Sequence, residues 1–220
     1  MNLGKKAKQI RDLIIDVAWK NQSHHVGSNL SCVEILTYLK YSLMEPGDLF
    51  ILSKGHAALA WYAILHDTGV ITKDELYDYQ KVFGEHMPYL PERDMPFATG
   101  SLGHGVAAAV GFALANPKRK VYVLCGDGET EEGSFYEALG LKRELDLTNM
   151  TVIVDNNGFQ GFKESPRRTV SYDGHSFPAI ESAFESNPEV IWFDTIKGKG
   201  VSEFENKLGS HYWTITKEDL

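Results

Sequence analysis

The chain has 220 residues, of which 43% are hydrophobic, so it is long enough to bury an extensive apolar core. Its formal net charge is −8 and its basic residues are scattered, which argues against a nucleic-acid-binding surface. The N-terminus mixes charged and apolar residues at helical spacing, and no segment reaches the roughly 20 apolar residues of a membrane span. We therefore expect a cytoplasmic protein with one domain over residues 1–220, and with Cys32 and Cys125 reduced in its core.

The first third of the chain is expected to be helical. Residues 10–20 and 31–43 repeat apolar side chains every three to four positions, and Ser31 with Glu34 has the form of a capping box for the second helix. We expect this helical segment to cover about residues 1–45. The next apolar run, DLFILS at 48–53, predicts a short buried strand.

The remainder alternates between helical and strand patterns. A helix is expected at 57–69, and Thr72 with Glu75 predicts a capping box that opens another at 73–80. Beyond these, helices are expected at 103–115 and 132–145, and strands at 120–126, 150–156 and 189–196. Strands that are apolar on both faces and separated by helices are typical of a parallel sheet covered on both sides. The predicted fold class is therefore α/β, with a doubly wound parallel sheet.

Distinctive polar residues follow two of the predicted strands. CGDGE begins at Cys125 and DNNGFQG begins at Asp155, and ligands in such sheets bind beyond the carboxyl ends of the strands. Asp127 and Asn157 are 30 positions apart (157 − 127), about one crossover, so their oxygens converge if the strands are neighbours. Each segment alone is also typical of a turn. Together they favour a site where Mg²⁺ or Ca²⁺ bridges the carboxylate and a diphosphate, with glycines that let the ligand approach the backbone.

The motifs resemble those of the N-terminal, diphosphate-binding part of the transketolase family. GDGETEEGSFYEA followed by TVIVDNNGFQG resembles the thiamine diphosphate signature, in which Gly-Asp-Gly precedes an Asn by about thirty residues. Further matches follow in the family's order: SHHVGSN, FILSKGHAA, GEHMP, TGSLGHG, YDGH and IKGKGVSEFEN. The resemblance covers roughly residues 20–211 and implies the fold of the family's diphosphate-binding domain.

The resemblance also implies roles for individual residues. Asp127 and Asn157 would bind Mg²⁺, or Ca²⁺ or Mn²⁺ in its place, through their side chains, and Phe159 through its carbonyl oxygen. The positions that would contact the cofactor are His56, Gly100, Ser101, Leu102, Gly126, Asp127, Gly128, Glu129 and Asn157.

Four histidines would act on the substrate. By the same resemblance, His25, His56, His86 and His211 point into the substrate channel. Imidazoles suit that place, because they donate hydrogen bonds to sugar hydroxyls and transfer protons near neutral pH. His175, in YDGH, is expected to be structural.

The segment LCGDGETEEG, residues 124–133, contains three acids besides Asp127, and they are expected to have different roles. In the family, the glutamates at the positions of Glu132 and Glu137 face the dimer interface, in a proton-relay network between active sites, and we expect this role for Glu132. Glu129 and Glu131 are expected to stabilise the positive N-terminus of the following helix.

The resemblance implies a partner as well. In the family, the glutamate that activates the cofactor and the aromatic stack for its pyrimidine ring belong to the domain that follows this one. Because this chain ends at Leu220, we expect a separate C-terminal transketolase subunit that supplies the pyrimidine-binding domain, in a heterotetramer. The implied reaction is transfer of a two-carbon ketol unit from a ketose or ketose phosphate to an aldehyde, and the isolated chain is expected to be inactive.

One segment departs from the family pattern. Between Gly161 and Tyr172 the family usually has a helix and a strand, and this chain has only a short polar segment. The shortening predicts a wider channel and an acceptor bulkier than a pentose phosphate. Arg167 and Arg168, within the segment, are interpreted as a solvated pair in preference to substrate ligands.

Two alternatives remain open. One is a subunit of another thiamine diphosphate enzyme, similar to 1-deoxyxylulose-5-phosphate synthase or to the alpha chain of a 2-oxo acid dehydrogenase. The other is a non-catalytic remnant that binds a partner. SKGH, GEHMP and KGKGVSEFEN favour transketolase over the related enzymes.

Overall fold

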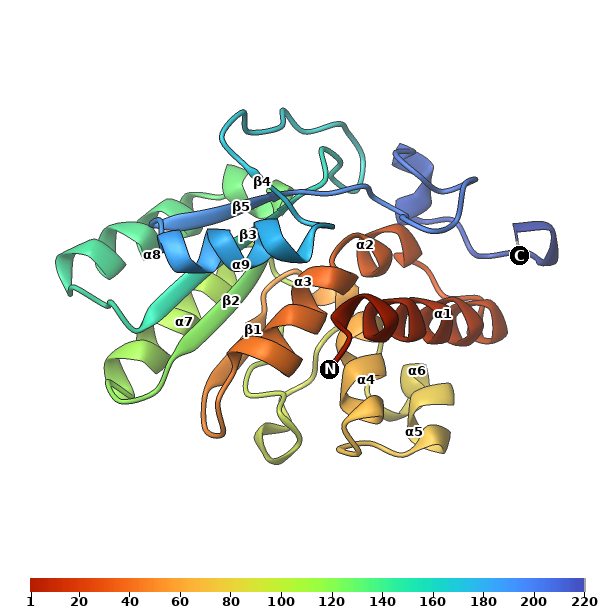
Figure 1. Ribbon diagram of the computed structural model, residues 1–220, viewed down its shortest axis with the longest axis horizontal. Helices are drawn as coiled ribbons and strands as arrows, with labels where there is room; N and C mark the ends of the chain where they lie inside the picture. Colours follow the sequence, from red (N-terminus) through yellow and green to blue (C-terminus); the bar gives the residue numbers. More distant parts are fainter. Residues whose placement is uncertain (220) are drawn as a thin grey trace.

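The structure, a computed structural model that describes residues 1–219, is built on a parallel sheet. Its five strands lie in the order β1-β2-β3-β5-β4, and each pairing is parallel (Figure 1). The strands are β1 (Leu49–Leu52), β2 (Val121–Gly126), β3 (Met150–Asn156), β4 (Tyr172–Asp173) and β5 (Val190–Asp194). The four strands expected from apolar runs are confirmed. The two-residue β4 was not predicted, because so short a strand leaves no periodic pattern.

Helices cover both faces of the sheet, as the fold class requires (Figure 1). Alternate residues of β2 point to opposite faces: Tyr122 and Leu124 belong to one core cluster, whereas Val121 and Val123 belong to the other. The first cluster contains residues of α1 (Leu3–Asn21), α2 (Val26–Ser31), α3 (Val33–Tyr38), α4 (Ala58–Asp67), α5 (Lys73–Tyr77), α6 (Tyr79–Val82) and α9 (Phe177–Ser186). The second contains residues of α7 (His104–Ala115) and α8 (Gly133–Glu144). The doubly wound α/β prediction is therefore confirmed.

The predicted helix at 31–43 is divided. Cys32 separates α2 from α3, and a π-helical turn, Leu39–Leu43, follows α3. The capping box predicted for Ser31 and Glu34 is wrong, because Ser31 donates to the Asp155 carboxylate while Glu34 accepts from Arg11 and pairs with His175. Buried polar groups are satisfied by these distant partners in preference to the helix terminus. The capping box of Thr72 and Glu75 is confirmed.

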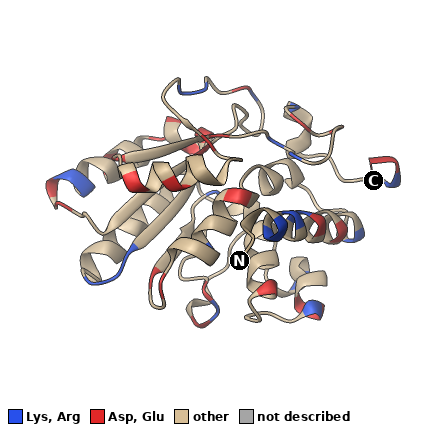
Figure 2. Cartoon of the chain, in the orientation of Figure 1, with Lys and Arg blue, Asp and Glu red and all other residues tan. Residues whose placement is uncertain are grey.

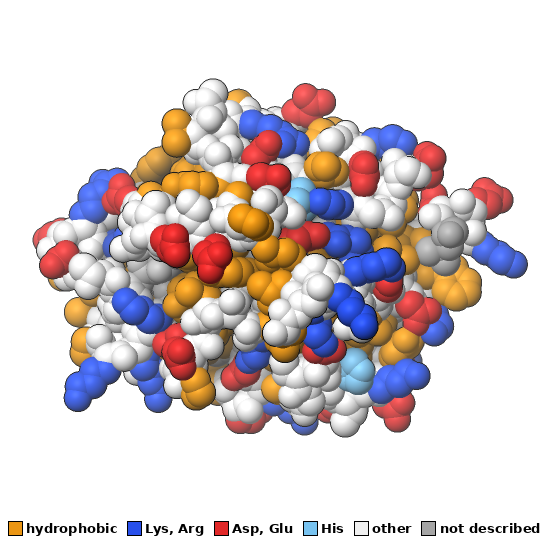
Figure 3. Space-filling model, in the orientation of Figure 1, with side chains coloured by type: hydrophobic (Ala, Val, Ile, Leu, Met, Phe, Trp, Pro, Cys, Tyr) orange, Lys and Arg blue, Asp and Glu red, His pale blue; other side chains and the backbone are white. Residues whose placement is uncertain are grey.

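The structure agrees with the sequence on three points: scattered charges, the lack of a membrane-spanning helix in the described residues, and buried cysteines. Basic and acidic residues are interspersed over the helices and loops (Figure 2), and side chains of both signs occur on the face shown in Figure 3. Within residues 1–219, no helix combines the length and the apolar character that a membrane crossing requires. Cys32 and Cys125 are buried free thiols, and burial raises the pKa of Cys32 to about 12, as expected for inert core residues.

Candidate active site

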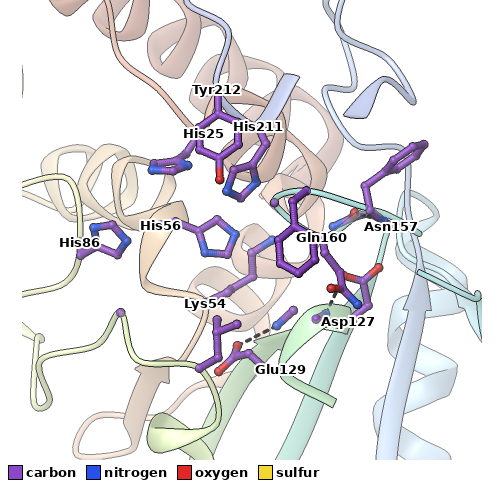
Figure 4. Close-up of a pocket in the computed structure, with 17 residues that line it drawn as sticks. His25, Lys54, His56, His86, Asp127, Glu129, Asn157, Gln160, His211 and Tyr212 are labelled. Carbon is purple, nitrogen blue, oxygen red and sulfur yellow. Dashed lines mark hydrogen bonds between the residues drawn. The ribbon is translucent and has the colours of Figure 1, made fainter. Parts of the chain in front are cut away.

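A cavity of about 250 Å³ lies at the carboxyl ends of β1, β2 and β3. Figure 4 shows histidines gathered on one side of it, with Asp127 and Asn157 on the opposite side. His56, Asp127 and Asn157 follow β1, β2 and β3, and the parallel sheet brings these loops together because its strands end at the same edge. The other three histidines come from segments that do not directly follow a strand.

Asp127 and Asn157 each follow a strand directly. β2 and β3 are neighbours, with Gly126 in register with Asp155, so the two loops that follow them meet. The Gly158 amide donates to Asp127 Oδ2 at 2.7 Å, and the Gly128 amide donates to Oδ1 at 2.9 Å. The two loops therefore meet as the 30-residue spacing predicts, and both Asp127 and Asn157 line the cavity.

The oxygen atoms at this point fit a hard divalent cation. Asp127 is only 4% exposed, and burial, followed by the charge of Asp155, raises its pKa to about 6. A cation would favour the ionised carboxylate. The Asn157 amide oxygen and the Phe159 carbonyl belong to the adjoining turn, in which the Phe159 amide donates to Asn157 Oδ1 at 3.0 Å. Residues 1–219 contain no group of three or more His, Cys, Asp or Glu arranged to hold a metal, so a cation here would depend on a mixed oxygen set, as Mg²⁺ commonly does.

The four predicted histidines line the same cavity (Figure 4). The ring centroid of His25 lies 5.6 Å from that of His56, 5.7 Å from His86 and 4.7 Å from His211. His25 has a left-handed backbone, with φ of 60°, which is uncommon outside glycine. The conformation is secured by the His25 amide, which donates to the His211 carbonyl at 2.9 Å and so joins two segments of the site.

Three of these rings are neutral at physiological pH. Burial is the main cause that lowers the pKa of His25, of His56 and of His211, the last to about 3, and neighbouring histidines or lysines add to it. His25 Nδ1 is buried without a hydrogen-bond partner among the described residues. In this cavity the rings therefore suit hydrogen bonding to a ligand better than the proton transfer near neutral pH expected from the sequence.

The neutral histidines predict a pH dependence of stability. Below about pH 6.5 the unfolded chain protonates imidazoles that stay neutral in the folded chain, so they lower the free energy of unfolding as pH falls. The raised pKa of Asp127 acts in the opposite direction, so the effect of one histidine is measured as a difference between variants. The urea midpoint of His56→Asn should fall less than that of the wild type between about pH 7 and about pH 5.5. The exposed His104→Asn is the control, and equal pH slopes for wild type and His56→Asn would contradict the assignment.

A buried charge cluster under the cavity was not predicted from the sequence. The ammonium of Lys54 pairs with the Asp155 carboxylate, which also accepts from the hydroxyls of Ser31 and Thr195. Lys197 donates to the carbonyl of Gln160 at 3.2 Å, and burial with the nearby Lys54 charge lowers its pKa to about 8. Lys54 lines the cavity, and its ammonium charge is balanced there by Asp155. The available signal was a lysine directly after a predicted buried strand, in SKGH.

The glutamates of the Gly-rich loop have three different environments. Glu129 lines the cavity but is buried, and its carboxylate accepts from the Ser53 hydroxyl and from the amides of Gly103, at 3.0 Å, and Gly126, at 2.9 Å. The expected role of Glu129 at the exposed start of a helix is wrong, because the 3-10 turn Asp127–Glu131 directs it inward, where it joins three loops.

The other two glutamates are exposed. Glu131 pairs with Lys163 at 2.7 Å and accepts from Gln160 at 2.6 Å, so it anchors the next loop and not the helix end that was predicted. Glu132 is the N-cap residue of α8 and lies outside the cavity lining. Its interface role stays a prediction.

The loop before α7 contributes part of the cavity wall. Gly100 and Leu102 line the cavity, as expected for cofactor-contacting positions. Ser101 does not: it is exposed, and its hydroxyl lies 3.5 Å from Nε2 of His104.

The loop after Asn157 adds residues that the sequence did not indicate. Gln160, Gly161 and Phe162 line the cavity together with Tyr212 from the C-terminal segment. Arg167 and Arg168 are both exposed and neither lines the cavity, as expected for a solvated pair, but each also has a partner in the fold. Arg167 pairs with Asp194, and the Arg168 guanidinium lies 4.9 Å from the centre of the Trp192 ring.

His175 has the structural role expected for it. Its Nδ1 lies 3.0 Å from the Glu34 carboxylate, and its Nε2 accepts from the Ile196 amide at 2.8 Å. The ring thus connects α3 to the segment that carries Lys197.

Comparisons with known proteins agree on one family. The family described as "Transketolase, thiamine diphosphate binding domain" matches residues 4–162. An apulose-4-phosphate transketolase subunit of Phocaeicola vulgatus is 31% identical, over 97% of this chain and 89% of that protein. A 6-deoxy-6-sulfo-D-fructose transketolase subunit of a Clostridium species is 33% identical, over 99% and 93%.

Single-chain transketolases match over a smaller share of their length. Human transketolase is 31% identical over 93% of this chain but only 38% of its own length. Among solved structures, the transketolase of Leishmania mexicana superposes with a TM-score of 0.91 at 25% identity, covering 100% of this chain and 40% of that one. The chain thus spans about two fifths of the single-chain enzymes.

Proposed function

The chain belongs to the transketolase family, in which it matches the thiamine diphosphate binding domain, and on this premise we propose that it is the N-terminal subunit of a two-chain transketolase. The observation that carries the proposal is the cavity itself, where the Gly-Asp-Gly and Asn-Asn-Gly loops meet opposite four histidines. The reaction is transfer of a two-carbon ketol unit from a ketose or ketose phosphate to an aldehyde.

The cofactor end of the site is formed by the strand-end loops. We propose that Asp127 and Asn157 side chains and the Phe159 carbonyl hold Mg²⁺, or Ca²⁺ or Mn²⁺. A Cβ placed on Gly128 would lie 3.2 Å from Gln160 Cγ, so glycine here lets the two strand-end loops pack closely where the cation would be held.

The substrate end is formed by the histidines. Thiamine diphosphate, when bound, supplies the carbon nucleophile and the electron sink of the reaction. Neutral His25, His56 and His211 can donate and accept hydrogen bonds, so they would orient sugar hydroxyls and a developing oxyanion without the cost of burying a charge. The unpartnered Nδ1 of His25 is one atom available to a ligand.

A second subunit completes the proposed enzyme. The two relatives that match along almost their whole length are named as transketolase subunits, which supports a partner for this chain. We propose that the partner supplies the pyrimidine-binding domain and that two copies of each chain form a heterotetramer, with Glu132 at the contact.

The sugar substrate is proposed to be specialised. The relatives are named for apulose 4-phosphate and for 6-deoxy-6-sulfo-D-fructose, and the loop from Gly161 to Tyr172 is short in this chain. Both observations favour a substrate outside the ordinary pentose phosphates.

An assay of the assembled complex tests the proposed reaction. With a panel of ketose donors and aldehyde acceptors, we expect ketol transfer, and faster turnover with a bulkier or modified sugar than with ribose 5-phosphate. Decarboxylation of pyruvate in place of ketol transfer would favour a subunit of another thiamine diphosphate enzyme. Equal or better turnover with ribose 5-phosphate would contradict the specialised substrate alone.

A further inference from the structure

The turn that carries Asn157 follows β3 directly and leads into a segment without a helix. β3 ends at Asn156, and Gly158 has φ of 82°, so the chain reverses direction immediately after the strand. On the cavity side, the Gly158 amide is held by Asp127. The opposite side of the turn is covered by the short polar segment that follows it, residues 162–171, and not by a helix.

Arg167 makes the side-chain contacts on that opposite side. Its Nη2 donates to the Asn157 carbonyl at 2.8 Å, and its Nη1 pairs with Asp194 at the end of β5. The Arg167 side chain also packs closely against Gly158, since a Cβ on that glycine would lie 2.8 Å from Arg167 Nε. A planar guanidinium with fixed donors can hold the turn to the neighbouring strand in one geometry.

Backbone contacts of the same segment support this arrangement. The Ser165 amide donates to the Gly158 carbonyl at 2.8 Å, and the Arg168 amide donates to the Asn156 side chain at 3.2 Å. Neither bond uses the side chain of Arg167 or Arg168, so both bonds remain when those side chains are replaced and keep the segment in place. The link from the Asn157 carbonyl to Asp194, however, depends on the Arg167 side chain.

We propose that Arg167 is a positioning residue for the metal, which fixes the Asn157 turn from behind so that the Asn157 amide oxygen and the Phe159 carbonyl face the cation. The inference rests on the proposed metal-diphosphate function. It deepens that function by assigning part of the metal affinity to the shortened segment. Arg167 touches neither cofactor nor substrate in this role.

Replacement of Arg167 should change the metal requirement in particular. In the assembled complex, Mg²⁺ would be titrated at fixed thiamine diphosphate, and cofactor binding followed by calorimetry. Because outer-shell partners of metal ligands commonly contribute 10–100-fold to affinity, Arg167→Ala should raise the half-saturating Mg²⁺ concentration about tenfold. Saturating Mg²⁺ should restore full cofactor binding. Arg167→Lys should give an intermediate value, since one ammonium cannot reproduce both contacts of the fork.

Two further variants separate positioning from general damage. Arg168→Ala removes the neighbouring guanidinium from the Trp192 ring and should leave the Mg²⁺ titration unchanged. If Arg167→Ala fails to fold, Asp194→Asn replaces it as the test, because that variant loses the ion pair that orients Arg167 and should raise the Mg²⁺ requirement in the same direction.

The outcomes are distinct. A wild-type Mg²⁺ titration for Arg167→Ala, or for Asp194→Asn where it replaces it, would overturn the inference. An equal rise in Arg167→Ala and Arg168→Ala would also overturn it, since the effect would then belong to the whole segment. If the wild-type complex itself bound thiamine diphosphate without Mg²⁺ dependence, the proposed function would fail before the role of Arg167 came into question.

Discussion

Replacement of Asp127 with asparagine or alanine is expected to abolish Mg²⁺-dependent binding of thiamine diphosphate, and with it ketol transfer by the assembled complex. Asp127 supplies the carboxylate at the point where the two strand-end loops meet, so its removal leaves neutral oxygens for the cation. Loss of an outer-shell partner alone commonly costs 10–100-fold in metal affinity, so loss of this ligand should exceed about 100-fold. Calorimetric titration of thiamine diphosphate in the presence of Mg²⁺ measures this loss of affinity.

The matched control for Asp127 is another acid in the same loop. Glu131 is exposed and pairs with Lys163, so Glu131→Gln should keep most of the cofactor affinity. Because burial already disfavours the charged form of Asp127, Asp127→Asn should remain folded, which circular dichroism and the urea midpoint check. Unchanged cofactor affinity and ketol transfer in both Asp127 variants would instead support a non-catalytic, partner-binding remnant.

Replacement of Asp155 should have the largest effect on stability. Its carboxylate is fully buried and neutralises Lys54, which is buried as well, and Lys197 lies in the same buried region. Removal of one partner from a buried ion pair leaves an uncompensated charge and typically costs about 3–5 kcal/mol. Asp155→Ala should therefore lower the free energy of unfolding by about that amount, measured by urea denaturation.

A double variant distinguishes lost charge balance from lost packing. Lys54→Met combined with Asp155→Leu removes both charges and should recover part of the lost stability, because an apolar pair of similar volume can replace a buried ion pair. The exposed pair of Lys8 and Asp12 is the control, and Asp12→Asn should change stability little. Equal stability of Asp155→Ala and wild type would show that this charge cluster does not hold the floor of the cavity.

The sheet could be predicted because its signal is local. Apolar runs of strand length, such as the one that became β2, are typical of strands buried on both faces, and the helices between them fixed the parallel topology. The meeting of Asp127 with the Asn157 turn followed from the same argument, since neighbouring parallel strands end at one edge.

The errors arose where the partners of a residue lie far away in the sequence. Ser31 and Glu34 have the spacing of a capping box, but each bonds to a residue more than a hundred positions away, Asp155 and His175 respectively. Glu129 resembles a charge at a helix end, yet it bonds to Ser53 and Gly103 on other loops. Local rules cannot predict such contacts, because they depend on which loops the sheet places side by side.

Lysines were missed for a related reason. A lysine is expected at the surface unless a buried partner is known, and the partner of Lys54 lies on a different strand. Arg167 is exposed, as expected, but the sequence did not show that its guanidinium also donates to the Asn157 carbonyl. In both cases the acceptor belongs to another strand or turn, which a local sequence pattern does not reveal.

The central claim is that this chain carries one half of a catalytic site whose other half lies on a partner subunit. Its most direct test is ketol transfer, at saturating Mg²⁺ and thiamine diphosphate, by the isolated chain, by the partner alone and by the two mixed. We expect weak, Mg²⁺-dependent cofactor binding and no transfer by the isolated chain, with activity only in the mixture. Full turnover by the isolated chain would contradict the account.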